Sequence, residues 1–275
     1  MQKKQKSKIL NNNHPIGIFD SGFGGLTVMS AINKILPLEN LIYFGDTAHV
    51  PYGTKSKNTV IKFSKKITSF LLKNKVKLIV IACNTASAFA LSALQKTSKI
   101  PIIGVIGPGA RAAAHISKNK KIGIIGTEGT INSNSYPKEI NKFLKATVYQ
   151  QICPLFVPLV EEGLVNSKIT DSIVKIYIQP LLNKKIDTIV LGCTHYPLLK
   201  KILKKNTGEG VVLIDSAIVT AHEVKNILNK QSLIANRKGK KFSKFYVSDN
   251  PEKFRKIGNR FFSKKILDVK KIELE

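Results

Sequence analysis

Two of the three cysteines end strand-like apolar segments and are followed at once by polar residues. Cys83 stands in the segment ACNT and Cys193 in the segment GCTH. A polar loop that leads into a helix N-terminus lowers a thiol pKa from about 8.5 toward neutrality, which gives a usable base. Burial as a structural cysteine is the alternative for each, and we assign that role to Cys153, which lies beside a proline in an apolar stretch.

A pair of thiols suits one class of reaction. Inversion of a stereocentre by proton transfer needs a base on one face of the carbon and an acid on the other. A single group would return the proton to the face it left. One cysteine suits a hydrolase nucleophile, whereas Cys83 and Cys193 in mirrored positions indicate a racemase or epimerase. Asp20, and His195 two residues after Cys193, are the candidate acid–base helpers.

The mirrored positions come from an internal repeat. Residues 74–85 read NKVKLIVIACNT and residues 184–195 read KKIDTIVLGCTH, and upstream IGIFDSG (16–22) is echoed by IGIIGTE (122–128). The repeat predicts two similar α/β halves, each with a strand that ends in a cysteine. Ligands of open α/β sheets bind at the carboxyl ends of the strands. If the halves face each other, the two cysteines approach one cleft from opposite sides.

Short apolar runs alternate along the chain with stretches of helical spacing, of which 57–74 and 169–183 are the clearest. Strands that are buried on both faces and joined by crossover helices predict an α/β protein with largely parallel sheets. The predicted strands are residues 16–19, 41–44, 78–83, 102–106, 122–125, 188–191 and 211–214.

The chain has 275 residues, with 45 basic and 17 acidic side chains and a formal net charge of +28. Only four of the basic residues are arginine, the lysines are scattered, and tryptophan is absent. Nucleic-acid sites concentrate charge on one face and use arginine forks and stacking aromatics. We therefore interpret the charge as compositional and expect no nucleic-acid partner; a lysine-rich nucleic-acid binder is the non-enzymatic alternative.

No segment predicts export, membrane insertion or metal binding. Residues 1–14 form a short basic tail without the apolar core of a signal peptide. The longest uncharged stretch, residues 78–95, is polar enough to predict a strand and a buried helix instead of a membrane span. The cysteines have no disulfide or zinc spacing, and His49, His115 and His222 have no metal-like partners. We expect a reduced, cytoplasmic protein without a metal.

Some glycines and Asp20 have alternative interpretations. Residues 107–112 fit the G-x-G-x-x-A outline of a dinucleotide-binding turn, although a proline between the glycines argues against a nicotinamide enzyme. Gly22, Gly24 and Gly25 could cradle phosphate, but the Lys-Ser/Thr of a P-loop is missing. We expect them to allow tight packing of a turn beneath a ligand. The alternative role for Asp20 is a helix N-cap.

Several segments together resemble the glutamate racemase family, in the family's order, from about residue 16 to the end. They are GIFDSGFGGLTV (17–28), FGDTAHVPYG (44–53), ACNTAS (82–87), CPLFVPLVEEG (153–163), GCTHYPLL (192–199) and YVSDNPEKF (246–254). Aspartate racemase is the nearest alternative, because it shares the paired cysteines. The PYG and CTHY forms favour glutamate.

The resemblance implies a cofactor-independent interconversion of L- and D-glutamate that supplies D-glutamate for peptidoglycan synthesis. Cys83 would take the α-proton from the D-enantiomer while Cys193 supplies one to the other face, and the roles exchange in reverse. Asp20 would assist Cys83, and Glu161 with His195 would assist Cys193. Because the α-proton is a very weak acid, donors around the α-carboxylate must stabilise a carbanion-like transition state.

The resemblance also supplies candidate binding residues and partners. The choice of Glu161 over Glu162 rests on motif alignment alone. The family is commonly dimeric, and some members need a peptidoglycan-precursor activator, so we expect glutamate as the small-molecule substrate, a homodimer, and such an activator as an open alternative. The residues that match the substrate-holding positions are Asp20, Ser21, Tyr52, Gly53, Asn84, Thr85, Thr194 and His195.

The expected fold class is α/β, with two pseudo-symmetric, largely parallel α/β/α sandwich domains and the active site in the cleft between them. The first domain would comprise residues 15–107 and 219–275, and the second, residues 108–218, would be inserted between these parts. Closure of the cleft would exclude water from the site.

Overall fold

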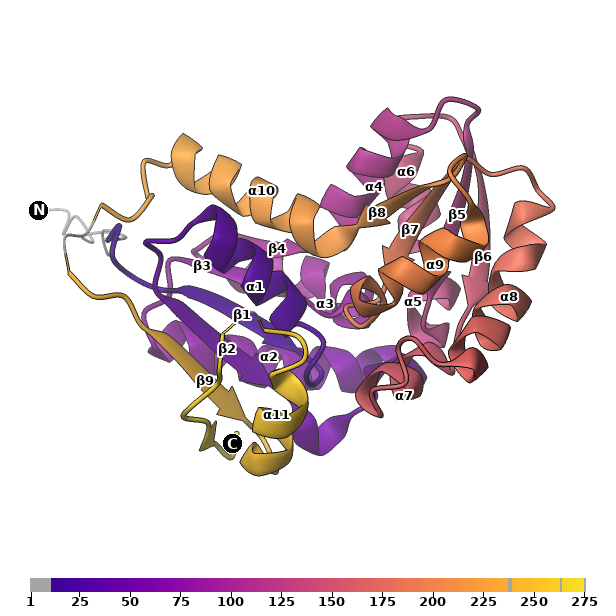
Figure 1. Ribbon diagram of the computed structural model, residues 1–275. Coiled ribbons are helices and arrows are strands. Elements are labelled where there is room, and N and C mark those ends of the chain that lie inside the picture. Colours follow the sequence, from indigo (N-terminus) through magenta and orange to yellow (C-terminus); the bar gives the residue numbers. More distant parts are fainter. Residues whose placement is uncertain (1–10, 237–238, 263, 275) are drawn as a thin grey trace, which may run out of the picture.

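Two parallel β-sheets, each with helices on both faces, make up the residues that the structure describes (Figure 1). The structure, a computed structural model, describes residues 11–236, 239–262 and 264–274. The first sheet contains β1 (Ile16–Asp20), β2 (Leu41–Gly45), β3 (Leu78–Ile81), β4 (Ile102–Gly104), β9 (Ser243–Val247) and β10 (Lys270–Lys271). The second contains β5 (Lys121–Gly126), β6 (Thr147–Ile152), β7 (Thr188–Gly192) and β8 (Val212–Asp215).

The strand orders are β10-β9-β2-β1-β3-β4 and β6-β5-β7-β8, with parallel pairing between described neighbours. Thus β1 and β5, which carry the IGI repeat, each lie inside a sheet and pair directly with the strand that precedes a cysteine, β3 or β7. The predicted pair of parallel α/β halves is confirmed.

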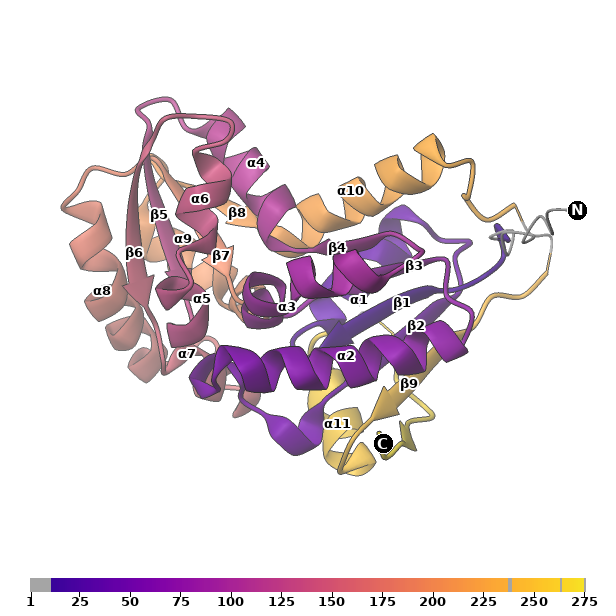
Figure 2. The same ribbon diagram turned by 180° about the vertical axis from the view of Figure 1, so that it is seen from behind.

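Helices cover both faces of each sheet (Figures 1 and 2). On the first sheet, α2 (Lys57–Lys73) and α3 (Asn84–Thr97) lie opposite α1 (Leu26–Ile35), α10 (Ser216–Lys230) and α11 (Pro251–Gly258). On the second, α4 (Ile106–Ile116) and α6 (Ser135–Ile140) lie opposite α8 (Lys168–Leu182) and α9 (Lys200–Thr207). The short helices are α5 (Glu128–Asn132) and α7 (Phe156–Glu161), with 3₁₀ turns at Thr47–His49, Tyr52–Thr54 and Tyr196–Leu199.

Alternation along the central strands explains this layering. In β1, Ile16 and Ile18 join the core beneath α1, whereas Phe19 joins the core beneath α2 and α3. A parallel strand that is covered on both faces must be apolar on both, as this one is. Helix α2 begins where the Ser56 hydroxyl accepts the Thr59 N–H at 3.3 Å, and its buried residues recur with helical spacing.

The sequence located the central strands and the long helices but missed the sheet edges. Strands β6, β9 and β10 were not predicted, because they are partly exposed and rich in polar residues. Strand β3 stops at Ile81, short of the predicted end at Cys83, because Cys83 already caps α3. Residues 78–95 form a strand followed by a helix, as predicted. No helix in the described ranges is both long and apolar enough to span a bilayer.

Two alternative interpretations of the sequence are wrong. The G-x-G-x-x-A run lies inside α4, so it is not the turn before a helix that a dinucleotide would need. Asp20 ends β1, and α1 begins only at Leu26, so Asp20 does not cap that helix. The predicted domain limits fall in the first turns of α4 and α10, and the division itself stays a prediction. Of the basic tail, residues 1–10 lie outside the described residues.

A buried ion pair joins distant chain segments at the end of the first sheet where its strands begin. Lys77 Nζ lies 2.6 Å from Glu39 Oε2, and both side chains are almost inaccessible. Lys77 also donates to the carbonyl of Leu233, and Glu39 accepts the N–H of Ala235, both in the segment after α10. The pair therefore ties the chain that returns from the second sheet to the base of β3.

Lys77→Met should lower the free energy of unfolding by about 3–5 kcal/mol, because it leaves the Glu39 carboxylate buried without its counter-charge. Denaturant-induced unfolding followed by circular dichroism measures the loss. Lys73→Met, at an exposed position at the end of α2, is the control and should change stability by no more than about 0.5 kcal/mol. Equal stabilities of the two variants would contradict this role for the pair.

Candidate active site

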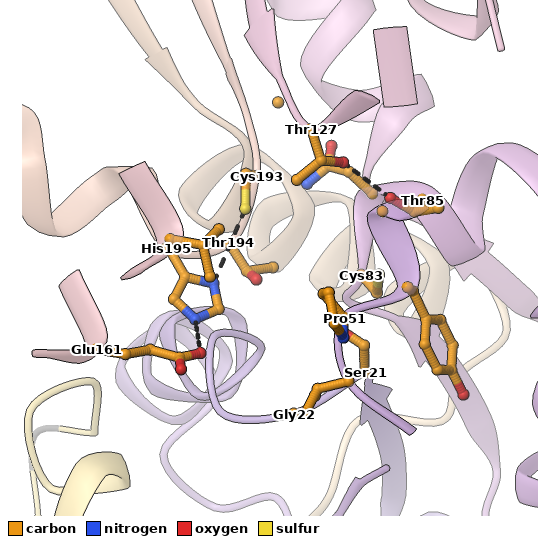
Figure 3. A pocket seen from close by; sticks show the side chains of 16 residues that line it. Ser21, Gly22, Pro51, Cys83, Thr85, Thr127, Glu161, Cys193, Thr194 and His195 are labelled. Atoms are coloured by element: carbon orange, nitrogen blue, oxygen red, sulfur yellow. Dashed lines mark hydrogen bonds and ion pairs between the residues drawn. The ribbon is translucent and has the colours of Figure 1, made fainter. Parts of the chain in front are cut away.

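A cavity of about 50 Å³ lies where the carboxyl ends of the central strands of both sheets meet (Figure 3). The first sheet contributes residues after β1, β2 and β3, and the second contributes residues at the end of β7 and after β5, β6 and β7. This is where parallel α/β sheets place ligands. The lining residues are Ser21, Gly22, Val50, Pro51, Tyr52, Gly53, Cys83, Asn84, Thr85, Thr127, Val157, Glu161, Gly192, Cys193, Thr194 and His195.

Cys83 and Cys193 both line this cavity and lie on opposite sides of it (Figure 3). Each is only 7% exposed. Cys83 occupies the N-cap of α3, where its sulfur accepts the N–H of Ala86 at 3.4 Å. Cys193 directly follows β7. The mirrored placement that the internal repeat predicts is thus present: one thiol from each half faces the same space.

The helper candidates differ between the two sides. Beside Cys193, His195 Nδ1 lies 3.8 Å from the sulfur, and His195 Nε2 lies 3.0 Å from Glu161 Oε1. Glu161 ends α7 and lines the cavity, whereas its neighbour Glu162 is exposed. The structure therefore brings Glu161, and not Glu162, to the imidazole.

On the other side, Asp20 is completely buried at the end of β1. Its Oδ2 accepts the N–H of Gly22 at 3.0 Å. Burial raises the pKa of the Asp20 carboxyl, while the charge of His195 and backbone N–H groups of the following turn oppose that rise. Asp20 is not itself in the cavity lining, but its charge raises the pKa of the Cys83 thiol, so the two groups interact.

The prediction that the polar loops lower the thiol pKa values is wrong. Burial raises the pKa of Cys83 to about 12, and the charge of Asp20 adds to the rise, against the smaller effect of the Ala86 N–H. Burial likewise raises the pKa of Cys193 far above its usual range. Desolvation outweighs the helix N-terminus because both sulfurs are almost completely removed from water. Both thiols are protonated at neutral pH.

The other predicted binding residues, Ser21, Tyr52, Gly53, Asn84, Thr85 and Thr194, all line the cavity. The Tyr52 hydroxyl donates to buried Asp46 at 2.5 Å, so that bond fixes the ring at the cavity wall. The Asn84 side chain accepts the Tyr136 hydroxyl through Oδ1 at 2.7 Å. Its buried Nδ2 has no hydrogen-bond partner among the described residues, which leaves a donor for a ligand oxygen.

Sequence reasoning missed one polar lining residue, Thr127, at the end of β5. Its hydroxyl lies 3.0 Å from that of Thr85 and 3.1 Å from that of Thr130, so the cluster bridges the two halves (Figure 3). The repeat could have identified it, because aligning IGIFDSG with IGIIGTE places Thr127 opposite Ser21. Hydroxyls can donate to a carboxylate at this end of the cavity.

The described part of the chain contains no cluster of three or more His, Cys, Asp or Glu side chains suited to a metal ion. His49 is bonded to Asp46 at 2.8 Å and stacks on Phe63, while His115 and His222 are exposed on helices. Cys153 is buried in the core away from the cavity lining, as expected of a structural cysteine.

A family model and several proteins of similar sequence identify this chain as similar to amino-acid racemases. The family model for Asp/Glu/Hydantoin racemase matches residues 16–224. A glutamate racemase from Geobacter metallireducens is 50% identical over 261 residues, which cover 94% of this chain and 97% of that protein. One from Neisseria meningitidis serogroup A is 48% identical over 267 residues, covering 96% and 98%.

Solved structures give the same result. The glutamate racemase isoform RacE1 of Bacillus anthracis superposes with a TM-score of 0.92 at 40% identity, covering 96% of this chain and 99% of that one. The Francisella tularensis enzyme in complex with D-glutamate gives 0.90 at 39% identity, with the same coverage. An Escherichia coli glutamate racemase in complex with L-glutamate and the activator UDP-MurNAc-ala gives 0.78 at 28% identity, covering 95% and 99%.

The raised pKa of Cys83 predicts how fast an alkylating reagent modifies it. The thiolate is the reactive form, so the rate with iodoacetamide should rise about tenfold per pH unit from pH 8 to beyond pH 11, because the pKa is about 12. Peptide mapping by mass spectrometry resolves Cys83. In the urea-unfolded chain, the control, the same peptide should approach its plateau near pH 9–10. A plateau near pH 9 in the folded protein would contradict the effect of burial.

Proposed function

The chain belongs to the Asp/Glu/Hydantoin racemase family, and we propose that it interconverts L-glutamate and D-glutamate with side chains alone. The observation that carries the proposal is the presence of two thiols, Cys83 and Cys193, on opposite sides of one buried cavity. A substrate α-carbon bound between the two cysteines would have one sulfur on each face, as inversion by two bases requires. The product D-glutamate would serve peptidoglycan synthesis.

In the D-to-L direction the Cys83 thiolate removes the α-proton. The C–H bond breaks, an S–H bond forms, and the electron pair is delocalised into the α-carboxyl group. The Cys193 thiol then donates its proton to the opposite face and becomes the thiolate. In the L-to-D direction the two cysteines exchange roles. Each turnover therefore leaves the proton on the other cysteine, and the helpers must restore the starting protonation states.

A buried thiol ionises when a nearby positive charge stabilises the thiolate and a helper accepts the proton. An ammonium group within about 4–6 Å of a thiol favours the thiolate, and the substrate carries one on the carbon to be deprotonated. Asp20, whose charge acts on the Cys83 thiol, would accept the proton of Cys83. His195, which is bonded to Glu161, would serve Cys193. The free Nδ2 of Asn84 and the hydroxyls of Ser21, Thr85 and Thr194 are donors for the substrate carboxylates.

The relatives reported above favour glutamate over aspartate as the substrate. The curated relatives above are glutamate racemases and cover nearly the full chain. An aspartate racemase homologue from Pyrococcus horikoshii matches with a TM-score of 0.56 at 18% identity, which shows a shared fold alone.

The partner expectations stay predictions. A homodimer would appear as a doubled mass in sedimentation equilibrium. Activation by a peptidoglycan precursor has support only from the E. coli relative, whose structure contains UDP-MurNAc-ala as an activator. The same compound, added to the present protein, tests it directly. We also propose that the protein is cytoplasmic and that it has no nucleic-acid partner.

Incubation with D-glutamate in deuterated water, with reductant but no cofactor, should yield L-glutamate labelled at the α-carbon, seen by optical rotation and NMR. Cys83→Ser and Cys193→Ser should each lower kcat by at least about 10²–10⁴-fold, the usual contribution of a general acid or base. Cys153→Ala, which removes the cysteine outside the cavity, should retain activity. Turnover of aspartate alone would contradict the substrate, and no exchange with either amino acid would contradict the racemase proposal.

Glu161→Gln should lower kcat/KM by about tenfold or more, because a neutral amide holds the His195 ring without stabilising its protonated form. The matched control is Glu162→Gln, which makes the same change one residue later at an exposed position. It should leave the kinetics within twofold of the wild type, as about 0.5 kcal/mol or less is usual for surface changes. Equal losses in both variants would contradict the assignment of Glu161.

A further inference from the structure

The turn at residues 21–25, which joins β1 to α1, lies between the two groups of helper residues. It begins directly after Asp20 and includes the lining residues Ser21 and Gly22. In the view of Figure 3, Ser21 and Gly22 lie between Cys83 and the pair formed by His195 and Glu161. The last two residues of the turn are adjacent glycines, and each faces a different side of the site.

Gly24 lies against the second half of the protein. A Cβ atom on Gly24 would overlap the Thr194 hydroxyl and would lie 2.5 Å from Nδ1 and 2.7 Å from Cε1 of His195. Thr27 also joins these two segments, because its hydroxyl lies 2.9 Å from the Gly24 carbonyl oxygen and 3.1 Å from the Thr194 carbonyl oxygen. The loop that follows Cys193 therefore rests directly on the backbone of Gly24.

Gly25 lies against the first half. A Cβ atom there would be 2.5 Å from Asp20 Cβ, 2.9 Å from Ala82 Cβ and 2.9 Å from the Tyr43 hydroxyl oxygen. The backbone N–H of Gly25 also opposes the rise of the Asp20 pKa. Ala82 immediately precedes Cys83 in the chain. The space next to Gly25 is thus filled by the side chains of Asp20, Ala82 and Tyr43, all from the first half.

Neither glycine is required by its backbone conformation. Gly25 has φ −61°, and the glycines with positive φ are elsewhere in the described chain, at 163 and 208. The requirement at both positions is space for a side chain that takes part in proton transfer. A single methyl group at either position would displace the helper on that side, while the thiol of the other half would keep its surroundings.

We propose that Gly24 and Gly25 are separate positioning residues for the two proton transfers, with Gly24 setting the His195 side and Gly25 setting the Asp20 side. The inference rests on the racemase function proposed above. Both glycines act through the residues they contact. A defect at one of them makes one of the two transfers rate-limiting, and this selectivity distinguishes positioning from a general loss of stability.

The test uses Gly24→Ala and Gly25→Ala with α-deuterated D- and L-glutamate, starting from each enantiomer in turn. Each variant should lose about 10²-fold in kcat/KM, as a misplacement of about 1 Å costs. In Gly24→Ala the deuterium isotope effect on kcat/KM should rise with L-glutamate, whose proton Cys193 removes, and fall with D-glutamate. In Gly25→Ala the two changes should be reversed.

Two further variants each remove one hydrogen bond beside the glycines without adding volume. They keep the test valid if an alanine variant fails to fold. Thr27→Val removes the hydroxyl that holds Thr194 and should shift the isotope effects in the direction of Gly24→Ala. Tyr43→Phe removes the 2.9 Å bond from the Tyr43 hydroxyl to the Gly22 carbonyl and should shift them in the direction of Gly25→Ala.

The matched control is Gly107→Ala in α4, where a Cβ atom would meet nothing within 4 Å, and its rates and isotope effects should equal those of the wild type. Isotope effects that stay at the wild-type values in the two glycine variants, in Thr27→Val and in Tyr43→Phe, with either enantiomer, would overturn the inference while the racemase function stands. Absence of glutamate turnover in the wild type and in Gly107→Ala would instead overturn the proposed function.

Discussion

A proton can leave one face of a carbon and return to the other only if two groups reach that carbon from opposite sides. One open sheet presents the ends of its strands along a single edge, and a second sheet that faces this edge can supply the opposing group. Here two parallel sheets turn their carboxyl ends toward a common cavity, and each contributes a thiol, Cys83 or Cys193. Contacts across the cavity, between Thr27 and Thr194 and between Thr85 and Thr127, hold the two edges together.

Burial has opposing effects in such a site. It strengthens the donors that must stabilise a developing carbanion, because their dipoles act in a low dielectric. It also raises the pKa values of Asp20 and of both thiols, so the resting site does not hold a thiolate. A positive charge on a bound ligand would favour the thiolate form of either cysteine.

The features that could be predicted from the sequence are those with a local signal in its repeats and apolar segments. The central strands and both cysteines could be located because a strand covered on two faces has a continuous apolar signature. The edge strand β6 has the sequence TVYQQI and is partly exposed, so its pattern does not differ from that of a loop. The thiol pKa values could not be predicted, because burial depends on the opposite half of the protein. The repeat aligns Thr127 with Ser21 and could have identified it, but its contact with Thr85 across the cavity could not be read from the sequence.

The repeat also shows where the symmetry of the site ends. In the aligned halves Asp20 corresponds to Gly126, and His195 corresponds to Thr85, so each helper lacks a counterpart in the other half. Enantiomers have equal free energies in water, so kcat/KM must be the same in both directions. A buried carboxylate and an imidazole differ in how they exchange protons, so kcat and KM are each free to differ with direction. The duplicated strands place the thiols symmetrically, whereas the proposed helpers are not duplicated, so the two sides of the site differ chemically.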